Sequence, residues 1–399
     1  MRKIQFVNLG LQYRSLRSEI LAAFDRVSRQ GAYVLGKEVG LFEEEFADYC
    51  GTRHAVSVAN GSDALYLALI ALGIGAGDEV ITVPNSFLAT AWAIARTGAR
   101  IVFVDVGNDM NINPALIERA CTRRTKAIMP VHLTGRVADM DAILKIAKRR
   151  RLHVVEDAAQ AVGARYHGQY AGSFGVCAGF SLHPLKNLHV HGDGGVITTS
   201  NEKIYSTLIQ LRNHGLVSRD ICNLIGINSR LDSVQAAIAR IKLRRLEKWN
   251  RRMRFLAGIY SSGLSRFVVV PEEKRYEESC YHRYMIRLEK RDDLGKFLEN
   301  NGIETKVNYP VPIHLQPAAK SLGYRRGDFP VAEKLADTIL SLPLYPEMKD
   351  PDVTFVIEMI RRYFERRGSC EKGPAGRARR RGFRFRRSAT SKRGCYAKA

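Results

Sequence analysis

Short apolar runs alternate with helical patterns between residues 54 and 199, and this alternation constrains the fold more than any other feature of the chain. The first runs lie at 54–58, 77–84, 101–105 and 127–132. Buried strands that alternate with helices are typical of a mostly parallel sheet with helices on both faces. Ligands of such open sheets bind at the carboxyl ends of the strands, so a functional site is expected there.

Two later runs end at side chains that carry chemistry. His153-Val-Val-Glu-Asp157 ends at a carboxylate, and Gly179-Phe-Ser181 ends at a serine that Lys186 follows. A lysine that joins pyridoxal 5′-phosphate (PLP) covalently needs an anion at the ring nitrogen and hydrogen-bond donors at the phosphate. Asp157 is the candidate for the anion, with Glu156 as the alternative, and Ser181 is one candidate donor.

A third candidate element is the turn Asn60-Gly-Ser-Asp63, which stands before a helical pattern that continues to Leu72. Small polar residues cap helices well, and a glycine lets another group approach the backbone closely. The free N–H groups and the dipole at a helix start favour a phosphate, although an ordinary helix cap has the same sequence.

The remainder of the chain predicts a second, smaller domain. A helical pattern covers residues 13–50, and a long one begins at Leu231. Beyond it, the pattern predicts strands at 267–271 and 281–288 and helices at 291–301, 330–340 and 351–366. We therefore predict three parts: a large α/β domain at 1–235, a smaller α+β domain at 236–367 and a tail at 368–399.

The tail carries much of the net charge of +23. Residues 369–399 contain eleven Lys or Arg and one Glu, which leaves +13 for residues 1–368. The tail has few aliphatic residues and no periodic pattern, so it is expected to be disordered. Its interleaved Arg and Phe are compatible with binding of RNA or an acidic membrane surface. We favour the alternative, an accidental extension of the chain.

The sequence does not indicate a signal peptide, a membrane span, a disulfide framework or a metal site. The N-terminus lacks the apolar core of a signal peptide, and the longest nearly apolar stretch, 64–76, is too short to cross a bilayer. The seven cysteines have no paired spacing, and His189 and His191 lack a third ligand at a suitable spacing. We expect a cytoplasmic protein without a metal site, and neither nucleic acid nor a membrane as a partner.

Taken together, the motifs resemble the DegT/DnrJ/EryC1/StrS family of PLP-dependent sugar aminotransferases. The resemblance covers nearly everything except the tail and includes, besides the runs already described, the segments 82–87, 131–141, 212–215 and 226–232. It implies a PLP-dependent aminotransferase of fold type I. The expected reaction moves an amino group from an amino acid to a keto-sugar, and L-glutamate is the first candidate for the amino acid. The sugar is expected to be nucleotide-linked and to serve polysaccharide, lipopolysaccharide or secondary-metabolite biosynthesis.

The resemblance also implies roles for single residues. Lys186 is the catalytic lysine, and Asp157 faces the pyridine nitrogen of PLP. Phe87 stacks on the pyridine face, and Gln160 contacts the side of the ring hydroxyl. The phosphate is expected to be bound by Gly61, Ser62, Asp63 and Ser181.

Three further residues are assigned to the partner chain and the substrate. In the family, the asparagine at the position of Asn228 reaches the phosphate in the neighbouring subunit, which implies a homodimer with shared active sites. Tyr309 and His314 lie in a segment, Tyr309-Pro-Val-Pro-Ile-His314, that approaches the substrate. A loop histidine without a role is nearly as good an interpretation of His314.

Departures from the family pattern leave the substrate open. Ser62 stands where threonine is common, Thr134 stands where an aromatic is common, and Ser-Leu-His-Pro-Leu-Lys186 replaces the more usual Ser-Phe-x-x-x-Lys. Amination of a free keto acid sugar or a cyclitol is the alternative by the same chemistry. Family dehydratases carry histidine at the lysine position, so Lys186 argues against that activity. A nucleic-acid or membrane-surface binder built around the tail is the alternative from another class.

Overall fold

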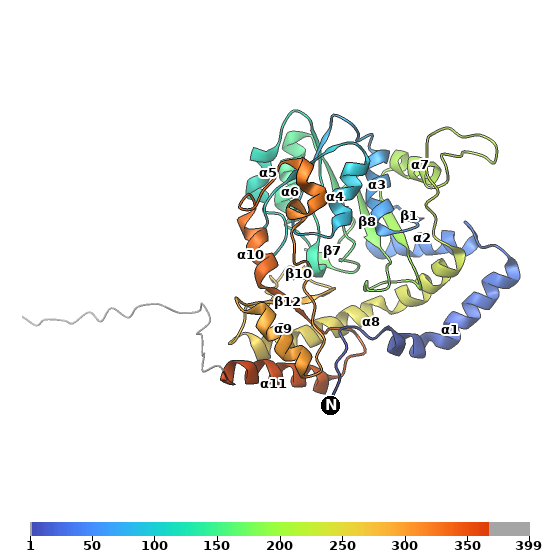
Figure 1. Ribbon diagram of the computed structural model, residues 1–399. Helices are drawn as coiled ribbons and strands as arrows, with labels where there is room; N and C mark the ends of the chain where they lie inside the picture. Colours follow the sequence, from blue (N-terminus) through green and yellow to red (C-terminus); the bar gives the residue numbers. More distant parts are fainter. Residues whose placement is uncertain (1, 367–399) are drawn as a thin grey trace, which may run out of the picture.

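A computed structural model describes residues 2–366, except for the side chain of Arg366, so the predicted tail lies outside the described residues. A seven-stranded sheet forms the centre of its larger part (Figure 1), and its strand order is β1-β9-β8-β5-β4-β2-β3. All neighbouring pairs are parallel except those of β9, which is antiparallel to both β1 and β8. The mostly parallel sheet is therefore confirmed. The strands are β1 (His54–Val58), β2 (Glu79–Thr82), β3 (Arg100–Phe103), β4 (Thr125–Ile128), β5 (His153–Asp157), β8 (Cys177–Ser181) and β9 (Gly195–Thr199).

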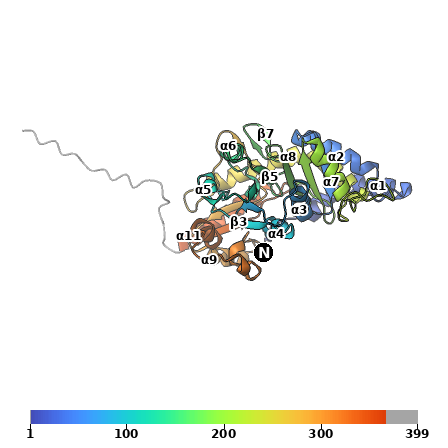
Figure 2. The same cartoon turned by 90° about the horizontal axis from the view of Figure 1, so that it is seen from above.

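Helices cover both faces of this sheet (Figure 2). One face carries α3 (Gly61–Ala71), α4 (Leu88–Arg96) and α7 (Glu202–Leu211), and the other carries α2 (Lys37–Cys50), α6 (Met140–Arg150) and the first part of α8 (Ser233–Leu264). Strand β1 illustrates why. Ala55 belongs to the apolar cluster that contains Phe42 of α2, whereas Val56 belongs to the one that contains Leu65 of α3. Because successive side chains of a strand point to opposite faces, both faces are apolar and both need a cover.

Polar side chains fix where the helices of the large part begin. The Asn60 side chain accepts a hydrogen bond from the Asp63 N–H at the start of α3, at 2.8 Å. Asn113 and Asn201 cap α5 (Pro114–Ala120) and α7 in the same way. The helical pattern predicted over 13–50 is two helices, α1 (Leu9–Gln30) and α2. It is interrupted because Gly31 adopts a left-handed conformation, φ 65°, that ends α1.

The smaller part is built on the second half of α8. Met253, Leu256 and Tyr260 of α8 pack in an apolar cluster with the two-stranded sheet of β11 and β12. The elements of this part are β11 (Tyr284–Arg287), β12 (Ile339–Leu342), α9 (Arg291–Asn300) and α11 (Asp350–Arg366). Helix α8 thus belongs to both cores, and the division of the chain at residue 235 stays a prediction.

The C-terminal half departs from the predicted pattern at three places. The strand predicted at 267–271 is a single bridge between Val269 and Arg287. The helix predicted at 330–340 ends earlier, as α10 (Pro330–Thr338), because Ile339 already pairs with Arg287 in the two-stranded sheet. A small sheet of β6 (Arg165–Tyr166), β7 (Gln169–Tyr170) and β10 (Glu277–Glu278) joins the two halves of the chain.

Within residues 2–366, none of the helices has the length and apolarity needed to cross a membrane.

Candidate active site

The carboxyl ends of β5 and β8 bring the predicted residues together. The two strands are neighbours, and Asp157 at the end of β5 pairs with Gly179 of β8. The start of α3 lies against the same edge, because a Cβ added to Gly61 would come within 2.7 Å of the Cβ of Ser181. Groups from three distant parts of the sequence therefore meet at one edge of the sheet, as the pattern predicted.

Asp157 is buried and held by two hydrogen bonds. Its Oδ2 accepts from the Thr90 hydroxyl at 2.6 Å, and its Oδ1 accepts from the Ala159 N–H at 3.2 Å. The Ser86 hydroxyl is hydrogen-bonded to that of Thr90 at 2.7 Å. Burial raises the pKa of Asp157, and the Thr90 bond and the positive charge of Lys186 oppose this rise. A buried carboxylate of this kind is suited to a positively charged partner such as a protonated ring nitrogen.

Glu156, the alternative to Asp157, is directed elsewhere. Its carboxylate accepts backbone N–H groups of Gly172, Phe174 and Gly175 at 2.7 to 2.8 Å. It also accepts from Nε2 of His132 at 2.9 Å, and Nδ1 of that ring accepts the Ala138 N–H at 3.1 Å. Adjacent residues of a strand point to opposite faces. Glu156 therefore fixes the loop at 172–175, which supports Asp157 as the site carboxylate.

Lys186 lies in the loop between β8 and β9, and its neighbours hold that loop. Its N–H donates to the His183 carbonyl at 2.8 Å, and its carbonyl accepts from Nδ1 of His189 at 2.9 Å. Burial lowers the pKa of Lys186 to about 8; the Asp157 carboxylate opposes this lowering, and the Arg283 charge adds to it. A large part of the amine is therefore unprotonated at mildly alkaline pH, as a general base must be.

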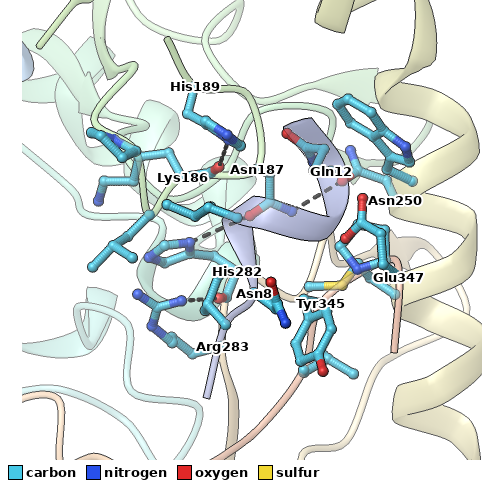
Figure 3. A pocket seen from close by; sticks show the side chains of 18 residues that line it. Asn8, Gln12, Lys186, Asn187, His189, Asn250, His282, Arg283, Tyr345 and Glu347 are labelled. Carbon is cyan, nitrogen blue, oxygen red and sulfur yellow. Dashed lines mark hydrogen bonds between the residues drawn. The ribbon is translucent and has the colours of Figure 1, made fainter. Parts of the chain in front are cut away.

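A partly open cavity lies beside Lys186, between the two parts of the molecule. Its walls come from the N-terminal segment, the middle of α8, the segment at 282–283 and the segment at 344–347. Figure 3 shows Lys186 and Arg283 on one side of this cavity and Tyr345 and Glu347 on the other. The cavity therefore reaches Lys186 from the side of the smaller part, whereas Asp157, Ser181 and Phe87 are not among the residues that line it.

The start of α3 has features of a phosphate site, but Asp63 differs from Gly61 and Ser62 because other side chains already bind its carboxylate. The Asp63 carboxylate is bound by Nη1 of Arg96 at 2.8 Å and by the Ser229 hydroxyl at 2.7 Å. Its N–H donates to the Asn60 side chain. Asp63 is therefore occupied by the chain itself, and the backbone of Gly61 and Ser62 and the Ser181 hydroxyl are the better candidates for a phosphate.

We expect Gly61→Ala to weaken PLP binding by on the order of 10-fold, since the added methyl would push against Ser181 where the phosphate is expected. Gly40→Ala is the matched control, because a Cβ at Gly40 in α2 meets nothing within 4 Å. The measurement is the PLP concentration needed to reconstitute the holoenzyme. Equal values for the two variants would contradict a phosphate site at Gly61.

Phe87, Tyr309 and Gln160 form the polar and aromatic side of the site. Phe87 is 52% exposed, and the centroid of its ring lies 5.7 Å from that of the Tyr309 ring. Gln160 accepts the Thr134 N–H at 2.9 Å and donates to the Tyr309 hydroxyl at 3.4 Å. Burial raises the pKa of Tyr309 to about 12, so the phenol stays protonated. A half-exposed aromatic ring at this edge offers a face on which a flat ligand can stack.

Two predicted residues are not brought to this edge by their side chains. His314 is buried, its Nε2 pairs with Glu333 at 3.0 Å, and its ring packs edge-on against Phe329. Asn228 is exposed, in a loop that the Ser229 hydroxyl attaches to the Ala59 N–H at 3.1 Å. Their roles toward substrate and partner chain stay predictions.

The sequence reasoning missed two residues of the site, Thr90 and Arg283. Thr90 lies three residues after Phe87 at the start of a helix, and residues at this spacing lie on the same side of a helix. This spacing was a signal that could have identified Thr90. Arg283 gave no signal, because a lone arginine in a predicted strand is ordinary. With them, the arrangement fits PLP: a buried carboxylate, a lysine of lowered pKa, a helix start at which a glycine Cβ would clash, and an open aromatic face.

Comparisons with known proteins agree with this fit. A family profile described as the DegT/DnrJ/EryC1/StrS aminotransferase family matches residues 14–361. A "pleiotropic regulatory protein" of Geobacillus stearothermophilus is 44% identical over 366 residues, which cover 90% of this chain and 98% of that protein. The dTDP-3-amino-3,4,6-trideoxy-alpha-D-glucose transaminase of Streptomyces venezuelae is 44% identical over 367 residues, 91% of this chain and 97% of that protein.

Solved structures give the same result. The structure of S. venezuelae DesV in complex with a ketimine intermediate superposes with a TM-score of 0.90 at 43% identity and covers 92% of this chain and 99% of that one. Other similar solved chains include forms described as containing PLP or its amine form, pyridoxamine phosphate. The fold and the cofactor class therefore agree between sequence, structure and relatives.

Proposed function

The chain belongs to the DegT/DnrJ/EryC1/StrS aminotransferase family and is a PLP-dependent aminotransferase, and on this premise we propose its substrates, residue roles and assembly. The acceptor is a nucleotide-linked keto-sugar, and the donor is an amino acid, for which L-glutamate is the first candidate. Relatives named as transaminases of dTDP- and UDP-linked sugars support this acceptor class. The observation that carries the proposal is the meeting of Lys186, Asp157 and the start of α3 at one sheet edge.

PLP supplies a ring that accepts the electron pair released when the Cα proton of the donor leaves. Asp157 keeps a proton on the ring nitrogen, which makes that acceptance possible, and Thr90 orients its carboxylate. Nζ of Lys186 takes the proton from the donor's Cα, and it returns a proton in the second half of the reaction. Phe87 covers one face of the site, and Gln160 contacts the polar side through its amide.

The test is an assay with purified protein, PLP, L-glutamate and a panel of acceptors, followed by the formation of 2-oxoglutarate. The panel contains keto-sugar nucleotides that differ in the carbon bearing the keto group, a free keto acid sugar and a keto-cyclitol. We expect turnover with at least one keto-sugar nucleotide. Turnover with only the free sugar acid or the cyclitol would favour the alternative acceptors instead.

We also propose that the protein is a homodimer with shared active sites. Exposed apolar side chains gather on α1, on the turn that follows it and on the segment at 217–225, and Ile225 is 99% exposed. Exposed apolar side chains are common where a partner chain packs, so these residues support an interface. The exposed Asn228 lies close to this segment and carries the proposed contact with the partner's cofactor.

Mixing two inactive variants tests the shared site. Asn228→Asp places a carboxylate against the phosphate and is expected to reduce activity strongly through like-charge repulsion. A heterodimer of this variant with Lys186→Ala contains one site with both native residues if Asn228 serves the partner's site. Activity should therefore reappear after the two variants are unfolded and refolded together. If Asn228 serves its own site, no heterodimer site is intact and the mixture stays inactive.

The cytoplasmic location remains a prediction, and so does the tail-based alternative, whose residues lie outside the described part of the chain. Removing residues 369–399 separates that alternative from the enzyme. An aminotransferase keeps its activity without the tail, whereas a nucleic-acid or membrane-surface binder loses its salt-sensitive binding.

A further inference from the structure

Arg283, directly before β11, is a buried cation without a carboxylate partner. Arg283 is only 9% exposed. Nη1 donates to the carbonyl of His282 at 3.0 Å, and the guanidinium carbon lies 5.2 Å from the centroid of the Phe6 ring. Among residues 2–366, no carboxylate forms an ion pair with it. Burying a charge is costly unless an opposite charge accompanies it, so an anionic ligand is the expected partner.

Backbone contacts place Arg283 on the reacting side of the site. Its N–H donates to the Thr134 carbonyl at 3.3 Å, and the Thr134 N–H donates to Gln160. The Arg283 charge adds to the lowering of the Lys186 pKa by burial, and the Tyr309 phenol opposes the lowering of the Arg283 pKa by burial. Figure 3 shows Arg283 and Lys186 on the same side of the cavity. Arg283 is therefore grouped with Gln160, Tyr309 and Lys186 and not with the helix start that suits the phosphate.

The chemistry of the two substrates decides which anion belongs there. The α-carboxylate of an amino donor is bonded to the carbon from which Lys186 takes the proton, so it must lie beside Lys186. The diphosphate of a sugar nucleotide is separated from the reacting ring carbon by part of the sugar ring. We propose that Arg283 binds the α-carboxylate of the amino donor through two parallel N–H···O bonds. This inference rests on the proposed function.

The first experiment isolates the half-reaction with the donor. The holoenzyme is mixed with L-glutamate, and the loss of the visible absorbance of the lysine-bound cofactor is followed at varied L-glutamate. Arg283→Gln should raise the half-saturating L-glutamate concentration by on the order of 100-fold, the usual consequence of losing one partner of a buried charge pair. The return half-reaction, started from the pyridoxamine phosphate form with a keto-sugar nucleotide, should keep its half-saturating concentration.

Arg287→Gln is the matched control. Arg287 lies four residues further on in β11, is partly buried and donates to Asn108 at 3.4 Å, away from Lys186. It should leave the dependence on L-glutamate unchanged. Arg283→Lys keeps the charge but loses the planar, two-pronged guanidinium. Its half-saturating L-glutamate concentration should therefore fall between those of the wild type and Arg283→Gln.

A second measurement changes the ligand instead of the protein. The wild type should bind the α-amide of L-glutamate on the order of 100-fold more weakly than L-glutamate itself, whereas Arg283→Gln should bind the two alike. This comparison in the wild type needs no variant, so it holds even if a variant does not fold. If L-glutamine, the γ-amide, shows the larger penalty, Arg283 binds the side-chain carboxylate and the inference is wrong.

Three outcomes bear on this inference, and they separate its failure from that of the proposed function. A wild type that reacts with L-glutamate, together with an Arg283→Gln variant of unchanged L-glutamate dependence, overturns the inference alone. A raised half-saturating concentration for the keto-sugar nucleotide in place of L-glutamate does the same, because Arg283 then binds the acceptor's anion. A wild type whose cofactor absorbance responds to no amino acid overturns the proposed function and, with it, this inference.

Discussion

Lys186→Ala is expected to reduce turnover by at least about 10⁴-fold, because it removes both the covalent attachment point and the base that moves the Cα proton. The lowered pKa of Lys186, about 8, means that a large part of the amine is unprotonated at mildly alkaline pH. The variant should still bind PLP through the start of α3, but without the visible absorbance of the lysine-bound cofactor. Steady-state assays and absorbance spectra of the purified variant measure the two effects.

A rescue experiment separates loss of chemistry from loss of structure. A small primary amine in the buffer should restore part of the activity of Lys186→Ala, since it can occupy the space of the missing side chain and move the same proton. Lys145→Ala, an exposed lysine of α6, is the control and should retain full activity. A fully active Lys186→Ala enzyme would exclude the proposed mechanism.

Asp157→Asn is expected to reduce kcat by about 10³-fold, because a neutral amide no longer holds a proton on the ring nitrogen and the developing charge loses its stabilisation. Its effect on the fold should be small or favourable. Burial raises the pKa of Asp157, so the folded protein without cofactor binds this proton more tightly than the unfolded chain does. The charged carboxylate therefore lowers the free energy of unfolding as the pH rises through its range, and Asn removes that effect.

Glu156→Gln, one residue earlier, should give the opposite result. Its carboxylate accepts three backbone N–H groups and the His132 ring, and an amide cannot replace all of these acceptor positions. We expect the free energy of unfolding to fall by about 2–4 kcal/mol, with kcat nearly unchanged in the fraction that stays folded. Urea unfolding and active-site-normalised kinetics measure both. A larger fall in kcat for Glu156→Gln than for Asp157→Asn would reverse the assignment of the two carboxylates.

The residues that could be predicted share a local signal. Asp157, Ser181 and Lys186 follow the ends of apolar runs, and the carboxyl ends of parallel strands meet at one edge, so periodicity alone placed them together. The turn at Gly61 was found because a cap and a glycine mark a helix start. Both signals depend on neighbours in the sequence.

The features that could not be predicted depend on packing between distant segments. The Thr90 hydroxyl reaches Asp157 only because the start of α4 comes next to the end of β5, and the pairing of His314 with Glu333 requires α10 to return to the large part. Ile339 forms a strand and not a helical turn because Arg287 is available to pair with it. Local propensity is overridden wherever such a tertiary partner exists.

Helix α8 limits how the two parts of the molecule can move. Its 32 residues correspond to a rod of about 48 Å at 1.5 Å per residue. Leu246 is buried in one core, Met253 in the other, and the Asn250 side chain between them bonds to Val162 and Asn187. A hinge between the parts would have to bend this rod at its best-packed point. The position of Arg283 in the smaller part relative to Lys186 in the larger part should therefore change little through the catalytic cycle.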